Sequence, residues 1–384
     1  MGFDVIKIVM PKNVKPKENT KALKHLIDQK LLRRISNAIF SVYPQFDKKN
    51  FNALMPRLKD LEMKSRVYLL REELKKQLPQ DYKKAVNILL KSTRIKTLRG
   101  FDLWPYTEFI QTYGLNDVQI SLKALREITG LFTSEWAVRP FIKNYRFETL
   151  SFLLKCAADC DEHVRRWACE GSRPRLPWGE RLFDIIKDPN LTLPLLEKLK
   201  TDDSLYVRKS VSNHLNDLAK DHPDLVIKLL NRWKSAAPPK DILKIKWIIN
   251  RALRTLIKQG HPGALASVGV DPNAKIQVSK LVVQQNKIKL GEDLKLQFQL
   301  ASKSNKIQKV VIDYIIHFAK ANGTAATKVF KLKTFEMQPM KKLIITKTHS
   351  FKKIRTRQYY PGLHVVEIQI NGKRHAKISW HLKI

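Results

Sequence analysis

The sequence is poor in acidic residues. Its 384 residues include 35 Asp and Glu against 73 Lys and Arg, which gives a formal net charge of +38. The imbalance runs through the chain, with 50 basic and 29 acidic side chains in residues 1–270 and 23 and 6 in residues 271–384. An excess of this size indicates a polyanionic partner and favours nucleic acid over an anionic membrane surface.

Cysteine is also scarce. Cys156, Cys160 and Cys169 lie at spacings of four and nine, without the Cys-x-x-Cys pair that suits a zinc site. We expect all three to be small buried side chains on helices. The sequence therefore predicts no disulfide, no metal and no cofactor.

Long apolar runs are missing as well. No run approaches the roughly 18 residues needed to span a bilayer, and the start "MGFDVIKIVM" lacks the apolar core of a signal peptide. Met1-Gly2 fails the myristoylation pattern because Ile6 stands where Ser or Thr is required. We expect a cytoplasmic monomer without a membrane partner.

The motifs of several common enzymes are absent. The chain contains no GxGxxG, GxxxxGK[ST], HExxH or GxSxG sequence, which argues against nucleotide hydrolases, zinc peptidases and serine hydrolases. A basic scaffold with a few acids and aromatic residues remains.

Residues from about 18 to 268 are predicted to be helical, with short loops such as "KDHPD" and "SAAPPKD" that favour antiparallel helix pairs. Apolar residues recur at helical spacing. Three predicted apolar faces are Val207, Val211, Leu215 and Leu218; Ile245, Ile248, Ala252 and Leu256; and Leu225, Leu229 and Trp233.

A weak internal repeat supports stacked helix pairs. "ETLSFLLKCAADCDEHVRRWA" superposes on "LTLPLLEKLKTDDSLYVRKSV" with an offset of 43 residues, which places Val164-Arg165 on Val207-Arg208. Val138-Arg139 is a third copy of the pair. An apolar helix, an acidic turn and a helix that opens with Val-Arg are typical of HEAT-like repeats, whose period is about 40 residues.

The pattern changes to strands after residue 270. "LKLQFQL" alternates apolar and polar residues, and "VVEIQINGKRHAKISWHLKI" predicts a hairpin with its turn at Asn371-Gly372. Seven or eight strands between Lys275 and Ile384 predict an immunoglobulin-like β-sandwich. We therefore expect a mainly α protein, with a HEAT-like α-solenoid of stacked helix pairs in residues 1–270 and a C-terminal β-sandwich in residues 271–384.

Basic residues near the starts of the second helices have two interpretations. Because the second helices of such a solenoid line its concave side, Arg165, Arg166, Arg208 and Lys209 could contact DNA phosphates. Alternatively, the Arg of each Val-Arg pair belongs to the turn of its own repeat. Both interpretations stay open for Arg165 and Arg208, whereas phosphate contact is favoured for Arg166 and Lys209.

An insert follows the predicted helix that carries Arg165 and Arg166, in "CEGSRPRLPWG". Prolines and Gly179 stiffen an extended turn that displays Trp178, Arg173 and Arg175. Glu170 precedes it, either as a salt-bridge partner of Arg166 or Arg173 or as a catalytic acid. A carboxylate that faces DNA weakens DNA binding, so an acid at this position should have a compensating role.

Three motifs in this order resemble the AlkC family of DNA alkylation repair glycosylases, which are relatives of AlkD built on HEAT-like repeats. They are "HVRRWACEGSRPRLPWG", "YVRKSVSNHLNDLAKDHPDLVIKLL" and "INRALRTLIKQGHPGALA". The resemblance covers roughly residues 20 to 268, and the family's larger branch also carries an immunoglobulin-like domain after the helices. It implies excision of cationic N3-alkylated bases, such as 3-methylcytosine and 3-methyladenine, from duplex DNA.

The resemblance also assigns residues. The family's active-site acids correspond to Glu135, Glu170 and Asp217, and Trp178 corresponds to an aromatic wall of the lesion site. Trp136 and Trp104 are further candidates for lesion recognition.

The chemistry is consistent with these residues, because an alkylated base that is already a cation leaves without a general acid. A buried carboxylate would stabilise the oxocarbenium-like sugar and orient water. Trp178 would add a cation–π contact to the charged base. In this hypothesis Arg165, Arg166, Arg173 and Arg175 hold the DNA backbone.

A second basic cluster lies in "SFKKIRTRQYYPG", with Lys352, Lys353, Arg355 and Arg357 in one loop. The loop is either merely solvated or in contact with phosphate. Contact is favoured because this region is strongly basic and because the resemblance implies that the domain embraces DNA. The rival hypotheses for the whole protein are a non-catalytic HEAT-repeat adaptor for nucleic acid and a solenoid that binds acidic proteins.

Overall fold

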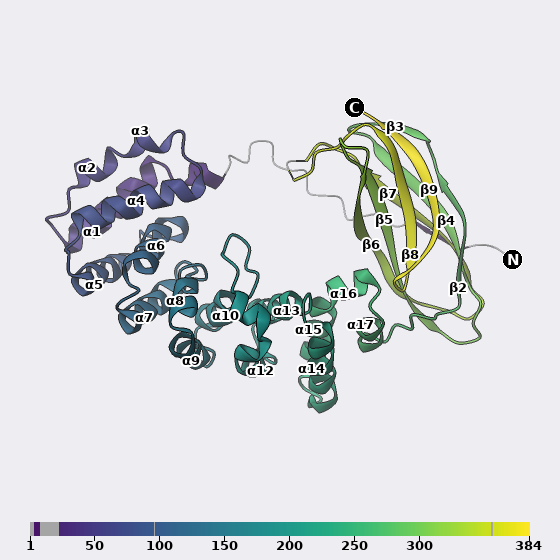
Figure 1. The fold of residues 1–384 in the computed structure, drawn as a ribbon, viewed down its shortest axis with the longest axis horizontal. Coiled ribbons are helices and arrows are strands. Elements are labelled where there is room, and N and C mark those ends of the chain that lie inside the picture. The colour runs from purple at the N-terminus through teal and green to yellow at the C-terminus, as the bar shows by residue number, and fades with distance from the viewer. Residues whose placement is uncertain (1–3, 8–22, 96, 355) are drawn as a thin grey trace. The chain divides into compact units, whose positions relative to one another are not determined.

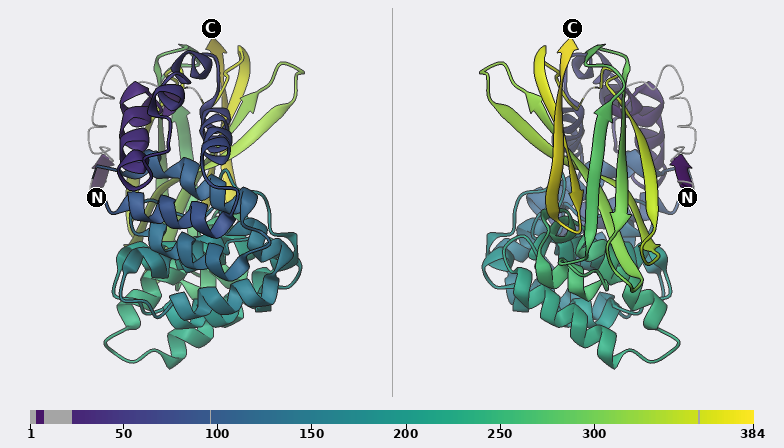
Figure 2. Two further views of the ribbon diagram at one scale, coloured as in Figure 1. Left: turned by 90° about the vertical axis from the view of Figure 1, so that its left-hand side faces the viewer. Right: turned by 90° about the vertical axis from the view of Figure 1, so that its right-hand side faces the viewer.

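A computed structural model describes residues 4–7, 23–95, 97–354 and 356–384 (Figures 1 and 2). The chain forms two compact units. One holds the described part of residues 17–222 together with residues 237–252, and the other holds strand β1, residues 223–236 and residues 253–384. The two units are described separately.

The first unit is helical. Its elements are η1 (Leu23–Leu26), α1 (Gln29–Val42), α2 (Lys48–Asn52), α3 (Met55–Leu58), α4 (Met63–Gln77), α5 (Tyr82–Thr93), η2 (Gly100–Leu103), α6 (Trp104–Tyr113), α7 (Val118–Thr129), α8 (Arg139–Asn144), α9 (Arg146–Cys156), α10 (Glu162–Gly171), α11 (Phe183–Lys187), η3 (Pro189–Leu191), α12 (Leu193–Leu199), α13 (Leu205–Leu218) and α15 (Ile242–Ala252). Helix α10 packs against α13 and α13 packs against α15, so alternate helices stack as layers (Figure 1). The predicted stacking of helix pairs is confirmed.

The 43-residue repeat is visible in the hydrogen bonds that precede α10 and α13. Asp161 and Ser204 cap the two helices with their side-chain oxygens. Arg165 donates to the carbonyls of residues 159 and 160 at 3.0 and 2.9 Å, and Arg208 donates to those of residues 202 and 203 at 2.6 and 2.8 Å. The same bonds recur one repeat later, so Arg165 and Arg208 each belong to the turn of their own repeat.

The apolar face predicted for α13 is confirmed, since Val207, Val211, Leu215 and Leu218 are all buried. The face predicted across residues 245–256 is wrong as a single helix. Helix α15 ends at Ala252, and α16 (Arg254–Gln259) begins after Leu253, whose backbone turns to φ −85° and ψ 3°.

The cysteines are free, and Cys156 and Cys169 are buried in helices as predicted. The prediction is wrong for Cys160, which is exposed. It lies in the acidic turn before α10, where side chains face solvent.

The second unit contains α14 (Pro223–Ala236), α16, α17 (Pro262–Ser267) and a β-sandwich. Its strands are β1 (Asp4–Lys7), β2 (Ile276–Val283), β3 (Lys287–Lys289), β4 (Asp293–Ser302), β5 (Gln308–Ala319), β6 (Ala325–Met337), β7 (Lys342–Ser350), β8 (Gly362–Ile370) and β9 (Lys373–Lys383). One sheet has the order β1-β7-β4-β2 and the other β3-β9-β8-β5-β6. Eight strands after residue 270, among the described residues, confirm the predicted sandwich.

Strand β1 was not predicted. It pairs in parallel with β7, with Asp4 opposite Leu343 and Lys7 opposite Thr346. The edge of one sheet is thus formed by residues from the opposite end of the chain.

The predicted hairpin turn is present between β8 and β9. Asn371 and Gly372 adopt φ 48° and 80°, the left-handed conformations that a type I′ turn requires. The turn lies directly against Gly260 at the end of α16, where a Cβ would stand 2.7 Å from the Gly372 carbonyl oxygen. The Gln369 side-chain amide donates to the Lys258 carbonyl at 2.9 Å, so both a backbone contact and a side-chain hydrogen bond join α16 to the sandwich.

Candidate active site

The structure brings the three predicted acids together in the helical unit. Glu135 lies in the turn before α8, Glu170 in the last turn of α10 and Asp217 in the last turn of α13. Each carboxylate is therefore supplied by a different layer of the stack. All three are buried, with exposed fractions of 7%, 6% and 3%.

Two arginines connect the acids. Arg173 lies 2.6 Å from Glu170 Oε1 and 2.8 Å from Asp217 Oδ2. Arg166 lies 2.5 Å from Glu135 Oε2 and 3.6 Å from Glu170 Oε1. The five side chains, called the acid cluster below, alternate in charge and hold one another in place.

Hydroxyl groups supply further donors to the acid cluster. Ser210 donates to Glu170 Oε2 at 2.6 Å, and Thr133 donates to Glu135 Oε2 at 2.8 Å. Burial raises the pKa of Glu135; Arg166 opposes this shift and the charge of Glu170 adds to it. Lys220 lies 3.3 Å from Asp217 Oδ1, so each of the three carboxylates has at least one basic partner.

The three predicted tryptophans form an aromatic group. The ring centroids of Trp104 and Trp136 lie 5.1 Å apart, and that of Trp178 lies 6.3 and 6.4 Å from them in nearly parallel planes. Trp104 is buried, whereas the Trp178 side chain is 54% exposed. Trp136 directly follows Glu135 and Trp178 lies on the loop that starts after Glu170, so the same two segments supply residues to both groups.

Trp178 is held in an unusual backbone conformation. Its φ of 64° is left-handed, which is uncommon and strained for a bulky residue. Lys64 donates to the Trp178 carbonyl at 2.7 Å, and the Trp136 indole donates to the Pro177 carbonyl at 3.0 Å. These bonds fix the loop so that the Trp178 indole projects from it.

Arg139 fastens both ends of the same loop. Its guanidinium donates to the carbonyls of Gly171 and Arg173, each at 2.8 Å, and to that of Glu180 at 2.9 Å. It is almost fully buried, and burial lowers its pKa to about 10. Sequence reasoning assigned Arg139 only to the repeat, although its position in the third Val-Arg pair was the available signal.

Glu108 is a buried acid that sequence reasoning missed. It accepts a hydrogen bond from the Trp104 indole at 3.3 Å and from Gln111 at 2.6 Å. Burial raises its pKa. It lies behind the aromatic group, and no local motif marked it.

Most of the arginines expected to contact DNA in the helical unit have protein partners instead. Arg165 and Arg208 belong to repeat turns, and Arg165 also pairs with Asp202 at 2.7 Å. Arg173 is buried between two acids, so the expectation that it holds phosphate is corrected: both its partners are carboxylates of the acid cluster.

The other side chains that were predicted to contact DNA differ in how exposed they are. Arg166 faces Glu135 and Glu170, Arg175 forms a bidentate pair with Asp221, and Lys209 is exposed. In the sandwich, Lys352 and Lys353 are exposed and the Arg357 guanidinium stacks on Phe318 at 4.1 Å. Arg355 lies outside the described residues.

Comparison with known proteins agrees with this arrangement. The model of the family "DNA alkylation repair enzyme" matches residues 102–244, which include the acid cluster and the aromatic group. The chain is 39% identical over 355 residues to the uncharacterized protein YhaZ of Bacillus subtilis, with 91% of this chain and 96% of that protein covered. The model of the YhaZ C-terminal Ig-like domain matches residues 277–384.

A solved structure is similar over nearly the whole chain. It is the alkylpurine DNA glycosylase AlkC of Pseudomonas fluorescens bound to DNA that contains an abasic site analog, with 36% identity, a TM-score of 0.89, and 95% of this chain and 100% of that chain covered. The chain belongs to the AlkC family of DNA alkylation repair glycosylases. The resemblance carried by "EGSRPRLPWG" is thereby confirmed, and the AlkC-type fold accounts for both the helical stack and the Ig-like sandwich. No helix among the described residues has the length and apolar character to span a bilayer.

Proposed function

We propose that this AlkC-type protein is a monofunctional DNA glycosylase that hydrolyses the N-glycosidic bond of cationic N3-alkylated bases, 3-methylcytosine and 3-methyladenine, in duplex DNA. The observation that carries the proposal is the burial of Glu135, Glu170 and Asp217 side by side in a chain with a net charge of +38. Buried acids are costly and require a function or partners that retain them.

The reaction needs negative charge more than a proton donor. A base alkylated at N3 carries a positive charge and leaves as a neutral molecule, while the sugar becomes oxocarbenium-like. A carboxylate near the sugar stabilises this second cation, and its remaining lone pairs accept hydrogen bonds from the attacking water. Glu170 is the central group, because it touches both arginines and Ser210.

Arg166 and Arg173 have a positioning role in this mechanism. Desolvation favours the neutral form of a buried carboxylic acid, whereas a nearby cation favours the charged form. Arg166 accordingly opposes the rise that burial causes in the pKa of Glu135, and the two guanidinium groups hold the three carboxylates in place.

The aromatic group supplies selectivity for damage. An indole face attracts a cation with about 0.5–2 kcal/mol, and this attraction is absent for a neutral, undamaged base. Trp178 is the exposed member, and its fixed backbone reduces the entropy lost when it contacts the lesion.

DNA binding is assigned to exposed cations of both parts. We propose that residues 1–270 carry the chemistry, with Lys209 at the phosphates, and that residues 271–384 contact DNA through Lys352 and Lys353. The protein would act as a monomer without a cofactor.

The test is release of bases from alkylated duplex DNA, identified by mass spectrometry. The wild type should release 3-methylcytosine and 3-methyladenine, and Glu170→Gln should slow release by about 10²–10³-fold. Glu127→Gln removes an exposed carboxylate of α7 and should keep the wild-type rate. Binding to alkylated DNA without release would instead support a non-catalytic adaptor.

A further inference from the structure

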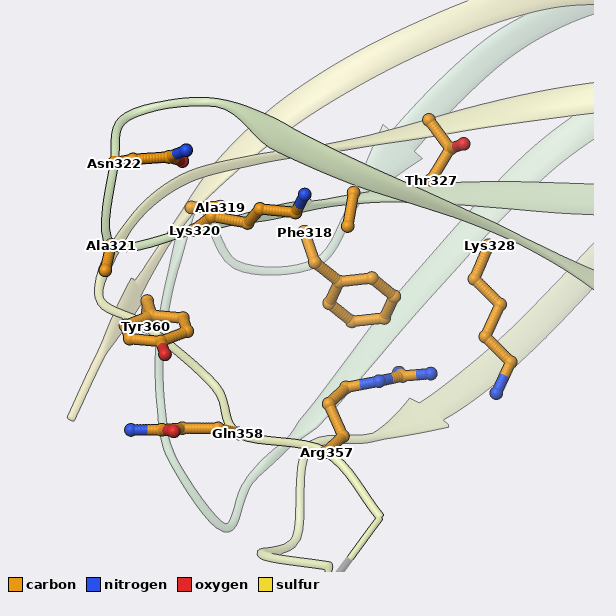
Figure 3. A pocket seen from close by; sticks show the side chains of 11 residues that line it. Phe318, Ala319, Lys320, Ala321, Asn322, Thr327, Lys328, Arg357, Gln358 and Tyr360 are labelled. Atoms are coloured by element: carbon orange, nitrogen blue, oxygen red, sulfur yellow. The ribbon is translucent and has the colours of Figure 1, made fainter.

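The sandwich contains a hollow of about 650 Å³ at one of its ends. It lies between the turn that joins β5 to β6 and the segment that precedes β8 (Figure 3). The lining residues are Phe318, Ala319, Lys320, Ala321, Asn322, Ala326, Thr327, Lys328, Arg357, Gln358 and Tyr360. It is separate from the acid cluster, which lies in the helical unit.

The charge of the hollow has one sign. Lys320, Lys328 and Arg357 line it, and none of the lining residues is acidic. Within the described part of the chain, none of these three cations forms an ion pair with a carboxylate. Like charges around one concavity repel each other until an anion binds, so an anionic ligand is favoured.

The hollow also has aromatic walls. Phe318 is one aromatic lining residue, and the Arg357 guanidinium lies over its ring at 4.1 Å. Lys328 lies over Phe330, a ring outside the lining, at 5.4 Å. The Tyr360 ring stands apart from these, on another side of the hollow (Figure 3). Beside it, Gln358 and Asn322 carry amide groups that can bond to the edge of a planar ligand.

We propose that this hollow binds an unpaired nucleotide of a DNA strand, with the base stacked on Tyr360 and the phosphate among Lys320, Lys328 and Arg357. Cationic side chains combined with an aromatic platform are the usual means of binding single strands. The volume suits one nucleotide, because small-ligand sites span roughly 300–1,000 Å³. A paired base inside a duplex has its faces covered by its neighbours and offers only its edges.

The site is additional to the excision reaction and does not depend on it. Undamaged single strands would be held at the sandwich, at a distance along the chain from the acids that act on the lesion. Such a site would favour DNA whose strands are locally separated.

The experiment uses the full chain and an unmodified trinucleotide with 2-aminopurine at its centre, whose fluorescence is quenched when the base stacks. Titration should show saturable quenching by the wild type. Tyr360→Leu should weaken binding about 5- to 150-fold, the range for loss of one base–aromatic stack, whereas Tyr360→Phe keeps the ring and should retain binding. Lys328→Gln should weaken binding, and Lys306→Gln, an exposed lysine outside the hollow, should not.

Two controls keep the outcomes distinct. Ala321→Glu places a negative charge on the exposed turn without removing packing and should also weaken binding, which covers the case in which Tyr360→Leu does not fold. A competing trinucleotide with an abasic centre should bind more weakly than one with a base. Equal binding by the abasic competitor, or unchanged quenching in Tyr360→Leu and Ala321→Glu, would overturn the proposal. The probe carries no alkylated base, so this result is independent of the excision assay.

Discussion

Arg173 and Arg175 provide a direct test of the acid cluster, because they lie two residues apart in one loop and differ in their partners. Arg173 is buried and bridges Glu170 and Asp217, with nitrogen–oxygen distances of 2.6 and 2.8 Å. Arg175 is only half-buried and pairs with Asp221, itself partly exposed, at 2.6 and 3.0 Å. Replacing each by Gln removes one positive charge from the same loop. Arg173→Gln leaves two buried carboxylates without this partner, whereas Arg175→Gln leaves only Asp221.

The expected cost follows from burial. Removing one partner of a buried ion pair costs about 3–5 kcal/mol, because the remaining charge is left without compensation. Removing one partner of an exposed pair costs about 0–1 kcal/mol. For a unit of roughly 150–250 residues, 1 kcal/mol shifts the melting temperature by about 2–4 °C. Arg173→Gln should therefore lower it by about 6–20 °C, and Arg175→Gln by less than about 4 °C.

Thermal unfolding and DNA binding are then measured on the same variants. A phosphate contact contributes about 0.9 to the slope of log K against log salt, so Arg173→Gln should leave the slope unchanged while base release slows. Arg173→Lys keeps the charge but not the bidentate geometry and should fall between wild type and Gln. Equal melting temperatures for Arg173→Gln and Arg175→Gln, together with a flatter salt slope for Arg173→Gln, would refute the buried bridge.

Three further predictions concern the chemistry and the DNA contacts. Because burial raises the pKa of Glu135, base release should fall as the pH drops through a range above that of an ordinary glutamate, where Glu135 gains a proton and loses its charge; Glu135→Gln should abolish this acid limb of the pH–rate profile. Trp178→Leu should slow release of 3-methylcytosine by about 2- to 30-fold through the lost cation–π contact, with Trp178→Phe between the two, and equal rates in all three proteins would argue against lesion recognition. The double change Lys352→Gln and Lys353→Gln should lower the salt slope of duplex binding by about 1.8, measured by fluorescence anisotropy across salt concentrations, and an unchanged slope would remove these lysines from the interface.

Several features of the fold could be predicted from the sequence. Helix periodicity and the Asn371-Gly372 turn depend on residues that are close in the sequence, and the 43-residue offset depends on the similarity of two segments; the structure shows each of them. Strand β1 was not readable, because its four residues carry no turn signal and pair with β7 at the other end of the chain. The break at Leu253 was hidden because apolar residues continue at helical spacing on both sides of it.

The residues of the candidate site could be predicted only in part from the sequence. The three acids and Trp178 were found through the resemblance to a family, since isolated acids in a basic chain have no local signature. Arg173 was misread as a phosphate contact, because its nearest carboxylate after Glu170 is Asp217, which comes from the next layer of the stack. Arg139 was missed because its partners lie in residues 171–180, which folding brings to it. Glu108 was missed although Trp104 and Gln111, which donate to it, lie on the same helix, because no motif marks a buried acid there.

The arginines of "RRWACEGSRPR" show why charge composition is an incomplete guide to binding. Arg165 closes a repeat turn, Arg166 and Arg173 hold the acid cluster, and Arg175 pairs with Asp221. All four are occupied by protein groups, although the segment resembles a phosphate-binding patch. The buried guanidinium groups of Arg166 and Arg173 offset part of the cost of burying the carboxylates beside them. The contribution of this segment to DNA binding should accordingly be smaller than its charge suggests, while its contribution to the reaction should be larger.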